Sequence, residues 1–150
     1  MPLKQVRILS TVLLAFAVGQ AGLGSGYLDG GRWLLVAHAV NAFVVLVLAI
    51  LSAVFGFALR RSGAPSWIFY FPLALVAVAG AQMALGFAGL RSVHVFLGVL
   101  LVSAITVFCS YCWRLRPGEA ATTPVAAEGQ RGLGQRAGDS AGRAPEPEAG

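Results

Sequence analysis

Four long runs without a charged residue constrain this chain more than anything else in its sequence. They extend from Ile8 to Leu28, from Trp33 to Leu59, from Ser62 to Leu90 and from Ser92 to Trp113. Each run exceeds the roughly 20 residues that an α-helix needs to cross a bilayer core of about 30 Å. We therefore predict an all-α fold, a four-helix transmembrane bundle. The helices are expected at about 8–28, 33–59, 67–90 and 92–113.

The overall composition agrees with a membrane protein. Hydrophobic residues make up 57% of the 150 residues, and charged residues make up 11%. A soluble domain of this size has too small an interior to hide so much apolar surface. We therefore expect the lipid bilayer to be the main partner of residues 1–116.

The composition changes abruptly at Pro117. Residues 117–150 contain five acids, three arginines and four prolines among many glycines and alanines. Such a segment buries too little apolar area to offset its chain entropy, so we predict a disordered cytoplasmic tail. The tail carries 3 minus 5, or −2, which leaves 5 plus 2, or +7, on residues 1–116. These basic residues flank helices, which indicates contact with lipid headgroups and not with nucleic acid.

Basic residues also predict the orientation of the chain. Lys and Arg are enriched on the cytoplasmic side of membrane proteins. The predicted topology is therefore multi-pass in the plasma membrane, with both termini cytoplasmic. The basic residues assigned to the cytoplasmic side are Lys4, Arg7, Arg60, Arg61, Arg114 and Arg116, against Arg32 and Arg91 outside.

An internal repeat divides the membrane domain into two halves. The segment from Gly19 to Gly24, which reads Gly-Gln-Ala-Gly-Leu-Gly, recurs from Ala81 to Gly86 as Ala-Gln-Met-Ala-Leu-Gly. Each copy is followed by a basic residue, a histidine and a helix that ends in arginine. The halves therefore predict two helical hairpins related by an axis along the membrane normal. A cleaved signal peptide is the alternative for the first run, but the repeat favours a true span.

A layer of polar side chains lies in the outer third of the predicted bundle. At 1.5 Å per residue, His38 lies about 7 Å and His94 about 4 Å below the outer ends of their helices. Gln20 and Gln82 fall at about 9 and 12 Å depth by the same measure, and Asn41 is one turn from His38. Ionisable side chains inside a membrane are costly, which makes the two histidines candidates for function. Gln20, Gln82 and Asn41 are candidates to line a bound cofactor beside them.

Two neutral imidazoles on alternate helices are the arrangement that holds a haem iron from both sides. The residues one turn after the histidines, Ala42 and Gly98, are small and would leave room for the ring. Guanidinium groups suit carboxylates, so Arg91 and Arg32 are candidates to hold the propionates. The candidate apolar walls are Val45, Leu97, Leu101 and Ile105.

The twice-repeated pattern Gln-x-x-Leu-Gly, a short loop and then a histidine early in the next helix resembles one four-helix half of the haem A synthase family. The resemblance covers residues 5–116. Members of that family have two such halves, and in each half the histidines on the second and fourth helices ligate a haem. The resemblance therefore implies that His38 and His94 are the axial ligands of a haem b. The chain is also similar to uncharacterised small four-helix membrane proteins with paired histidines.

The chain departs from the enzymes of that family in three ways. It has half their length, and its first outer loop has no cysteine pair. Where the enzymes carry a glutamate near the first histidine, the loop from Ser25 to Arg32 offers only Asp29. The resemblance therefore implies a haem site more than it implies a haem A synthase activity.

Other interpretations of these residues stay open. Histidines near a helix end also act as interfacial hydrogen-bonding groups, and Gln20 and Gln82 also hydrogen-bond neighbouring helices. Small-x-x-x-small steps are expected to let helix backbones approach each other. They are Gly22 with Gly26, and Gly80 with Ala84.

The cysteines of the chain, Cys109 and Cys112, form a Cys-x-x-Cys spacing near the predicted cytoplasmic end of the fourth run. This side of the membrane is reducing, and no second pair exists to complete a four-ligand site. We expect structural thiols, with reversible acylation as the alternative.

Three functions follow from these patterns. The first is electron transfer or haem handling by one haem b near the outer face, with a redox partner. The second is a cofactor-free accessory or scaffold protein. The third is a haem A synthase-like oxidase that acts as a homodimer, although the apolar runs contain no carboxylate for acid–base chemistry. No catalytic residue is predicted, and a non-enzymatic role is favoured.

Overall fold

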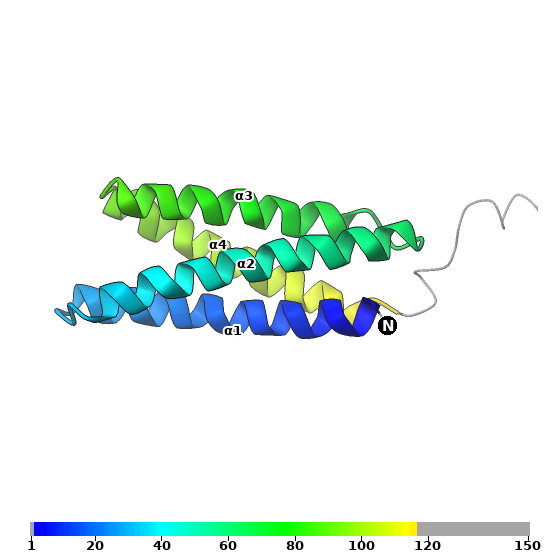
Figure 1. Cartoon of the computed structure of the whole chain (residues 1–150), viewed down its shortest axis with the longest axis horizontal. Coiled ribbons are helices and arrows are strands. Elements are labelled where there is room, and N and C mark those ends of the chain that lie inside the picture. Colours follow the sequence, from blue (N-terminus) through cyan, green and yellow to red (C-terminus); the bar gives the residue numbers. More distant parts are fainter. Residues whose placement is uncertain (1, 117–150) are drawn as a thin grey trace, which may run out of the picture.

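The computed structural model describes residues 2–116, which form four α-helices and no strand. The helices are α1 (Pro2–Leu28), α2 (Leu34–Arg61), α3 (Trp67–Phe87) and α4 (Arg91–Arg114), and they form an elongated bundle (Figure 1). All four helices are long and apolar enough to cross a membrane. The predicted all-α transmembrane bundle is thus confirmed, while the predicted tail, residues 117–150, lies outside the described residues.

α1 and α2 extend beyond the charge-free runs at the end of the bundle where the chain starts. α1 begins at Pro2 and so includes Lys4 and Arg7, while α2 continues to Arg61. Basic side chains at a helix end reach the water interface, so they do not interrupt the helix. α3 ends at Phe87, three residues before the predicted Leu90.

Each of the three turns uses a glycine in the left-handed conformation, which a side chain would disfavour. These glycines are Gly30, Gly63 and Gly89, with φ angles of 102°, 95° and 72°. In the last turn, the Leu90 N–H donates to the Leu85 carbonyl at 3.1 Å, which closes the end of α3. The turns are short, so neighbouring helices are antiparallel.

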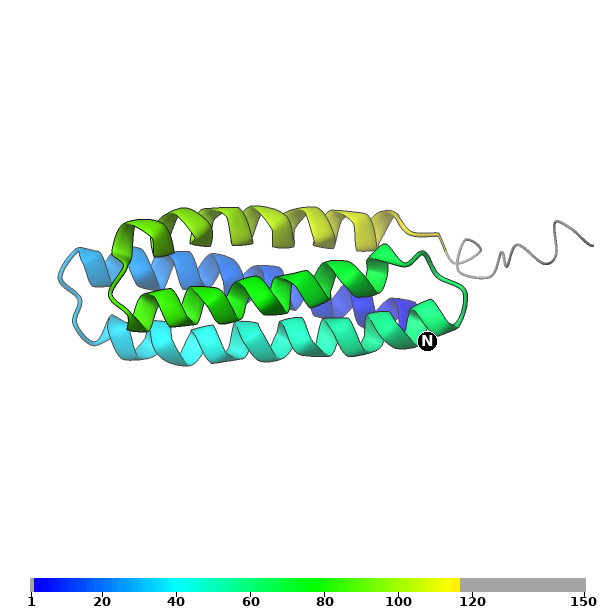
Figure 2. The ribbon, with the colours of Figure 1, turned by 90° about the horizontal axis from the view of Figure 1, so that it is seen from above.

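The helices pack around a ring in chain order. The backbones of α1 and α3 each lie close to those of α2 and α4, whereas within residues 2–116 the backbone of α1 does not approach that of α3, nor that of α2 the backbone of α4. In Figure 2, which is seen from above, the α3–α4 hairpin lies in front of the α1–α2 hairpin. α2 and α4 therefore lie on one diagonal of the bundle.

The core fills only one end of this ring. We call residues 18–44 and 82–104 the histidine end, and residues 3–17, 45–81 and 105–116 the tail end. Gln82 is the only fully buried side chain that the structure describes at the histidine end. The tail end has a continuous core, in which Phe108 is 0% exposed and its ring stacks on Phe71 at 5.6 Å. α1 contributes to this core through Val6 and Leu13, as expected for a true span.

Arg7 joins the start of α1 to the end of α4. Its Nη2 donates to the Leu115 carbonyl at 2.6 Å, and its Nε donates to the Cys112 carbonyl at 3.2 Å. The last carbonyls of a helix have no partner within the helix and carry the negative end of its dipole. Arg7 therefore caps α4, a role in addition to the topological one that the sequence predicted.

Among the predicted small-residue steps, Gly26 does lie against the neighbouring helix, since a Cβ there would collide with the Leu34 side chain of α2. At Gly22 and Gly80 the predicted close approach of helices is wrong. A Cβ atom at either position would meet nothing within 4 Å, because both positions face away from the neighbouring helices. The close approach occurs instead at Gly56 of α2, where a Cβ would collide with the backbone carbonyl of Ile68 on α3. Gly56 thus fixes the contact of these two helices at the tail end.

Candidate functional site

The two histidines face each other across the diagonal of the bundle. His38 comes from α2 and His94 from α4, and the centroids of their rings are 6.0 Å apart with an angle of 65° between the ring planes. Both side chains are half-buried. Their pairing is one contact between the two hairpins at the histidine end.

Each histidine is locked by the glutamine of the preceding helix. Gln20 Nε2 donates to the backbone carbonyl of His38 at 3.0 Å, and His38 Nδ1 lies 3.1 Å from the backbone carbonyl of Gln20. The second hairpin repeats both contacts, since Gln82 Nε2 donates to the His94 carbonyl at 2.9 Å and His94 Nδ1 lies 2.9 Å from the Gln82 carbonyl. The interpretation of the glutamines as helix contacts therefore holds in both halves.

These contacts define the protonation of the two rings. A backbone carbonyl only accepts hydrogen bonds, so Nδ1 of each ring must carry the proton. In a neutral imidazole this leaves Nε2 with a free lone pair. Ring nitrogens that bind metals are commonly prepared in this way, with the other nitrogen donating to a carbonyl.

A glycine lies against each imidazole, and this part of the site was not singled out from the sequence. A Cβ at Gly24 would come within 3.1 Å of His38 Cε1, and one at Gly86 within 3.2 Å of His94 Cε1. Both glycines follow their glutamine by four residues, which places them on the same helix face. The signal was present in the repeat, where Gln-x-x-Leu-Gly occurs in both copies.

The two halves differ in how the glutamine oxygen is satisfied. Asn41 Nδ2 donates to Gln20 Oε1 at 2.7 Å and to the Phe16 carbonyl at 3.0 Å. The corresponding residue three positions after His94 is Leu97, which has no donor. Gln82 Oε1 is consequently buried without a hydrogen-bond partner among residues 2–116.

The small residues one turn after the histidines have different surroundings from those predicted. A Cβ at Gly98 would meet Gln82 Nε2 at 3.2 Å, so this glycine makes room for the glutamine. Ala42, its equivalent, is half-buried. Among the predicted walls, Val45 and Ile105 belong to the core of the tail end, while Leu101 packs at its edge.

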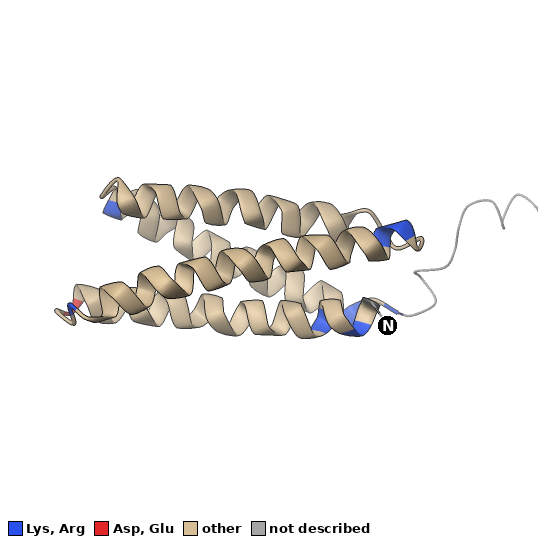
Figure 3. Cartoon of the chain, in the orientation of Figure 1, with Lys and Arg blue, Asp and Glu red and all other residues tan. Residues whose placement is uncertain are grey.

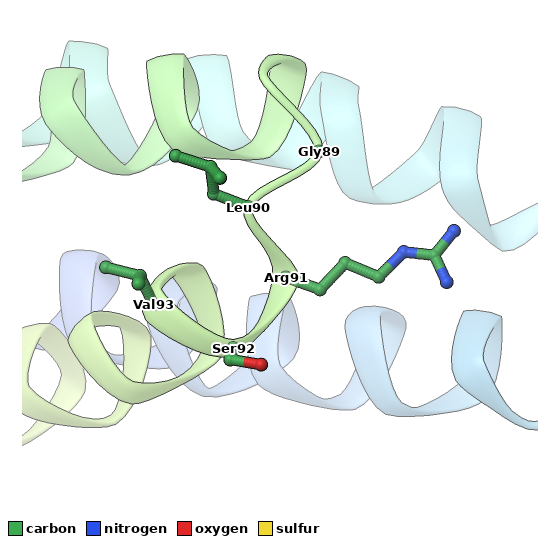
Figure 4. A pocket seen from close by; sticks show the side chains of 5 residues that line it. All are labelled: Gly89, Leu90, Arg91, Ser92 and Val93. Atoms are coloured by element: carbon green, nitrogen blue, oxygen red, sulfur yellow. The ribbon is translucent and has the colours of Figure 1, made fainter.

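The two arginines of the histidine end are exposed at the turns. Arg91 lies in a shallow pocket of about 330 Å³ that Gly89, Leu90, Ser92 and Val93 also line. Figure 4 shows the Arg91 side chain extending away from Leu90 and Val93. Arg32 is likewise exposed in the first turn. Neither guanidinium makes a hydrogen bond or ion pair with another described residue, so both are available to an anion.

The cysteines are both buried in the core of the tail end, with Cys109 7% and Cys112 0% exposed. They form no disulfide, and Cys109 Sγ lies 3.8 Å from Thr11 Oγ1. This burial agrees with structural thiols and leaves neither sulfur open to acylation. Residues 2–116 contain no group of three or more side chains suited to a metal ion.

No family model, curated protein or solved structure matches this chain. The paired histidines are therefore the feature of the chain from which its function is inferred.

Proposed function

We propose that this membrane protein binds one haem b between His38 and His94 and serves in electron transfer or haem handling. The observation that carries the proposal is the pair of imidazoles on diagonal helices, 6.0 Å apart between centroids. Each ring has its Nδ1 against a backbone carbonyl, so each Nε2 is free. In the proposed site, these two nitrogens would be the protein ligands of the haem.

The separation of the rings fits one iron between them. Nitrogen–metal distances of about 2.0 to 2.1 Å on both sides place two imidazole centroids about 6.3 Å apart. The observed 6.0 Å is within a few tenths of an ångström of that value. The two rings are therefore close enough to share one metal ion.

The surrounding helices also favour a site for a large planar group. The histidine end has no fully buried side chain besides Gln82 within the described residues, so few packing contacts would be lost on insertion. Arg32 and Arg91 would hold the propionates at the water interface, where guanidinium groups bind carboxylates well. When bound, haem would supply a one-electron couple.

We place the histidine end on the outer side of the plasma membrane and both termini in the cytoplasm. The support is the distribution of charge at the two ends of the bundle (Figure 3). The tail end carries Lys4, Arg7 and the arginines at the ends of α2 and α4, whereas the histidine end carries two arginines, Arg32 and Arg91, and one acid, Asp29. The excess of basic residues favours the cytoplasm for the tail end.

An absorption spectrum tests the haem site. The protein, expressed with excess haem and purified in a mild detergent, should show a Soret band and sharp bands on reduction. His38→Ala and His94→Ala should each lose haem or convert it from a six-coordinate low-spin to a high-spin spectrum, because one axial ligand is gone. Phe96→Ala is the control, since Phe96 lies two residues from His94 but is 64% exposed. Wild-type protein that stays colourless would contradict the proposal.

The second candidate is a cofactor-free scaffold, and the reciprocal Gln–His contacts favour it. Contacts of this kind fix the register of two helices without any ligand. In that case the purified protein would be colourless. The loss of thermal stability in His38→Ala, relative to the wild type, would then be the same with and without added haem. The haem proposal expects added haem to stabilise the wild type and not the variant.

The oxidase-like alternative receives less support. The one carboxylate among residues 2–116 is Asp29, which is exposed in the first turn. An enzyme of this kind would leave modified haem in the extracted pigment, whereas we expect unmodified haem b from a monomer or a homodimer.

A further inference from the structure

An apolar groove runs between α2 and α3 at the tail end, on the outside of the bundle. It has a volume of about 410 Å³ and exposes no polar surface. Ile50, Val54 and Phe57 of α2 form one wall, and Phe69, Leu73 and Val76 of α3 form the other. The rings of Phe57 and Phe69 lie 5.4 Å apart at the end nearest the turn. The groove is therefore open to lipid along its length.

Two arginines lie at the end of this groove. The Arg60 guanidinium is 4.9 Å from the ring centroid of Tyr70 and 5.8 Å from that of Phe69, and Arg61 is 5.7 Å from that of Phe57. Neither guanidinium makes a hydrogen bond with another described residue, so the N–H groups of both are open to an anion. No acidic side chain within residues 2–116 neutralises either group, since Asp29 lies at the other end.

The dimensions match one leaflet of a membrane. From Ile50 to Arg60 the helix rises about 15 Å at 1.5 Å per residue. This is half of a hydrocarbon core of about 30 Å. An acyl chain that lies in the groove therefore places its headgroup beside Arg60 and Arg61.

We propose that this groove is a binding site for an anionic phospholipid, with one acyl chain between α2 and α3 and the phosphate group on Arg60 and Arg61. Guanidinium groups bind phosphate through paired N–H donors. Basic pockets between transmembrane helices recognise anionic headgroups in this way. The site lies at the opposite end from the histidines and is independent of the haem proposal.

The apolar lining of the groove and the positive charge of Arg60 and Arg61 both favour a lipid as the ligand. A second copy of the chain would have to place its own apolar helices against the groove, and it would leave the two arginines without an anion. A neutral lipid would fill the groove but would not use them. The anionic lipid is the occupant that satisfies both parts at once.

Native mass spectrometry of the full chain in detergent tests this site, with phosphatidylglycerol and phosphatidylcholine as probes. We expect the protein to retain phosphatidylglycerol in preference to phosphatidylcholine. Each basic residue near an anionic lipid contributes about fivefold in affinity, so Arg60→Gln with Arg61→Gln should weaken retention about 25-fold. Lys4→Gln with Arg114→Gln removes the same charge from the same end and should leave retention within about twofold.

A second pair of variants tests the groove itself. Leu73→Trp fills it from an exposed position and should displace the lipid, whereas Leu100→Trp, at a similarly exposed position of α4, should not; their wild-type side chains are 45% and 49% exposed. Equal loss of lipid in test and control variants, or equal retention of the two lipids, would overturn the proposal. A dimer that Leu73→Trp disrupts, with no bound lipid, would assign the groove to a second copy and likewise overturn it.

Discussion

The two ends of the bundle are held together in different ways. At the tail end, a buried core joins all four helices, and the side-chain hydrogen bonds from α1 to α4 are made by Arg7, Thr11 and Trp113. At the histidine end, the described side-chain hydrogen bonds stay within one hairpin, as between Gln20 and His38. The difference separates stability from polar chemistry: one end fixes the fold, and the other presents the two imidazoles.

The largest expected difference between the ends is in side-chain packing. Phe108→Ala, at a 0% exposed position of α4, should lower the free energy of unfolding by about 3 kcal/mol. Phe96→Ala, in the same helix at the histidine end, should change it by less than about 0.5 kcal/mol. Unfolding in mixed detergent, followed by circular dichroism, measures both values. Equal losses would mean that the histidine end has a core of its own.

Replacing a glycine by alanine should change the free energy of unfolding with opposite signs at the two ends. Gly56→Ala forces a Cβ against the Ile68 carbonyl, which should cost about 2 kcal/mol because backbone must move. Gly22→Ala meets nothing within 4 Å, so the better helix propensity of alanine should add about 0.5 kcal/mol. The same unfolding measurement gives both values. A loss of stability in Gly22→Ala would show that another helix covers the face of α1 that carries Gly22.

Arginines should also differ between the ends. Arg7→Gln removes charged hydrogen bonds to the end of α4 and should destabilise haem-free protein by about 1.5 kcal/mol. Arg91→Gln removes an exposed group without a described hydrogen bond and should stay within about 0.5 kcal/mol in the same haem-free protein. A large loss of stability in Arg91→Gln, without one in Arg7→Gln, would contradict the helix-capping role of Arg7.

The smallest expected effect on stability concerns the two glutamines of the histidine end. Leu97→Asn would offer Gln82 Oε1 the donor that Asn41 offers Gln20, and should stabilise the protein by about 0.6 kcal/mol. Asn41→Leu should destabilise it by a similar amount. The difference between the two variants, measured in parallel melts, should therefore exceed either change alone. If Leu97→Asn destabilises, the two halves of the repeat are not equivalent there.

The sequence was sufficient to predict the fold because a bilayer imposes a length and excludes charge. The four runs predicted the four helices, and the repeat predicted two hairpins with His38 and His94 at similar depth. Chain order around the ring then placed these residues on one diagonal. Within the candidate site, the structure shows that the two rings lie close together, while their role as ligands stays a prediction.

The finer contacts were not predictable, since they depend on which way each helix is rotated. Gly22 and Gly24 are two residues apart, yet one faces open space and the other faces an imidazole. Gln82 lies against Gly98, where only a small residue fits. This contact depends on how far α3 and α4 are shifted along each other. Spacing along one helix gives the face of a residue but not the neighbour opposite it.

The turn at residues 62–66 is the one covalent link between the hairpins, and it lies at the end opposite the histidines. The hairpins are thus arranged like the arms of a pair of tongs whose pivot is at the tail end. Opening the arms would change the distance between the imidazoles without breaking a described side-chain hydrogen bond at their tips. A planar ligand that enters between the hairpins from the lipid would meet one histidine on each hairpin, each already held by its glutamine.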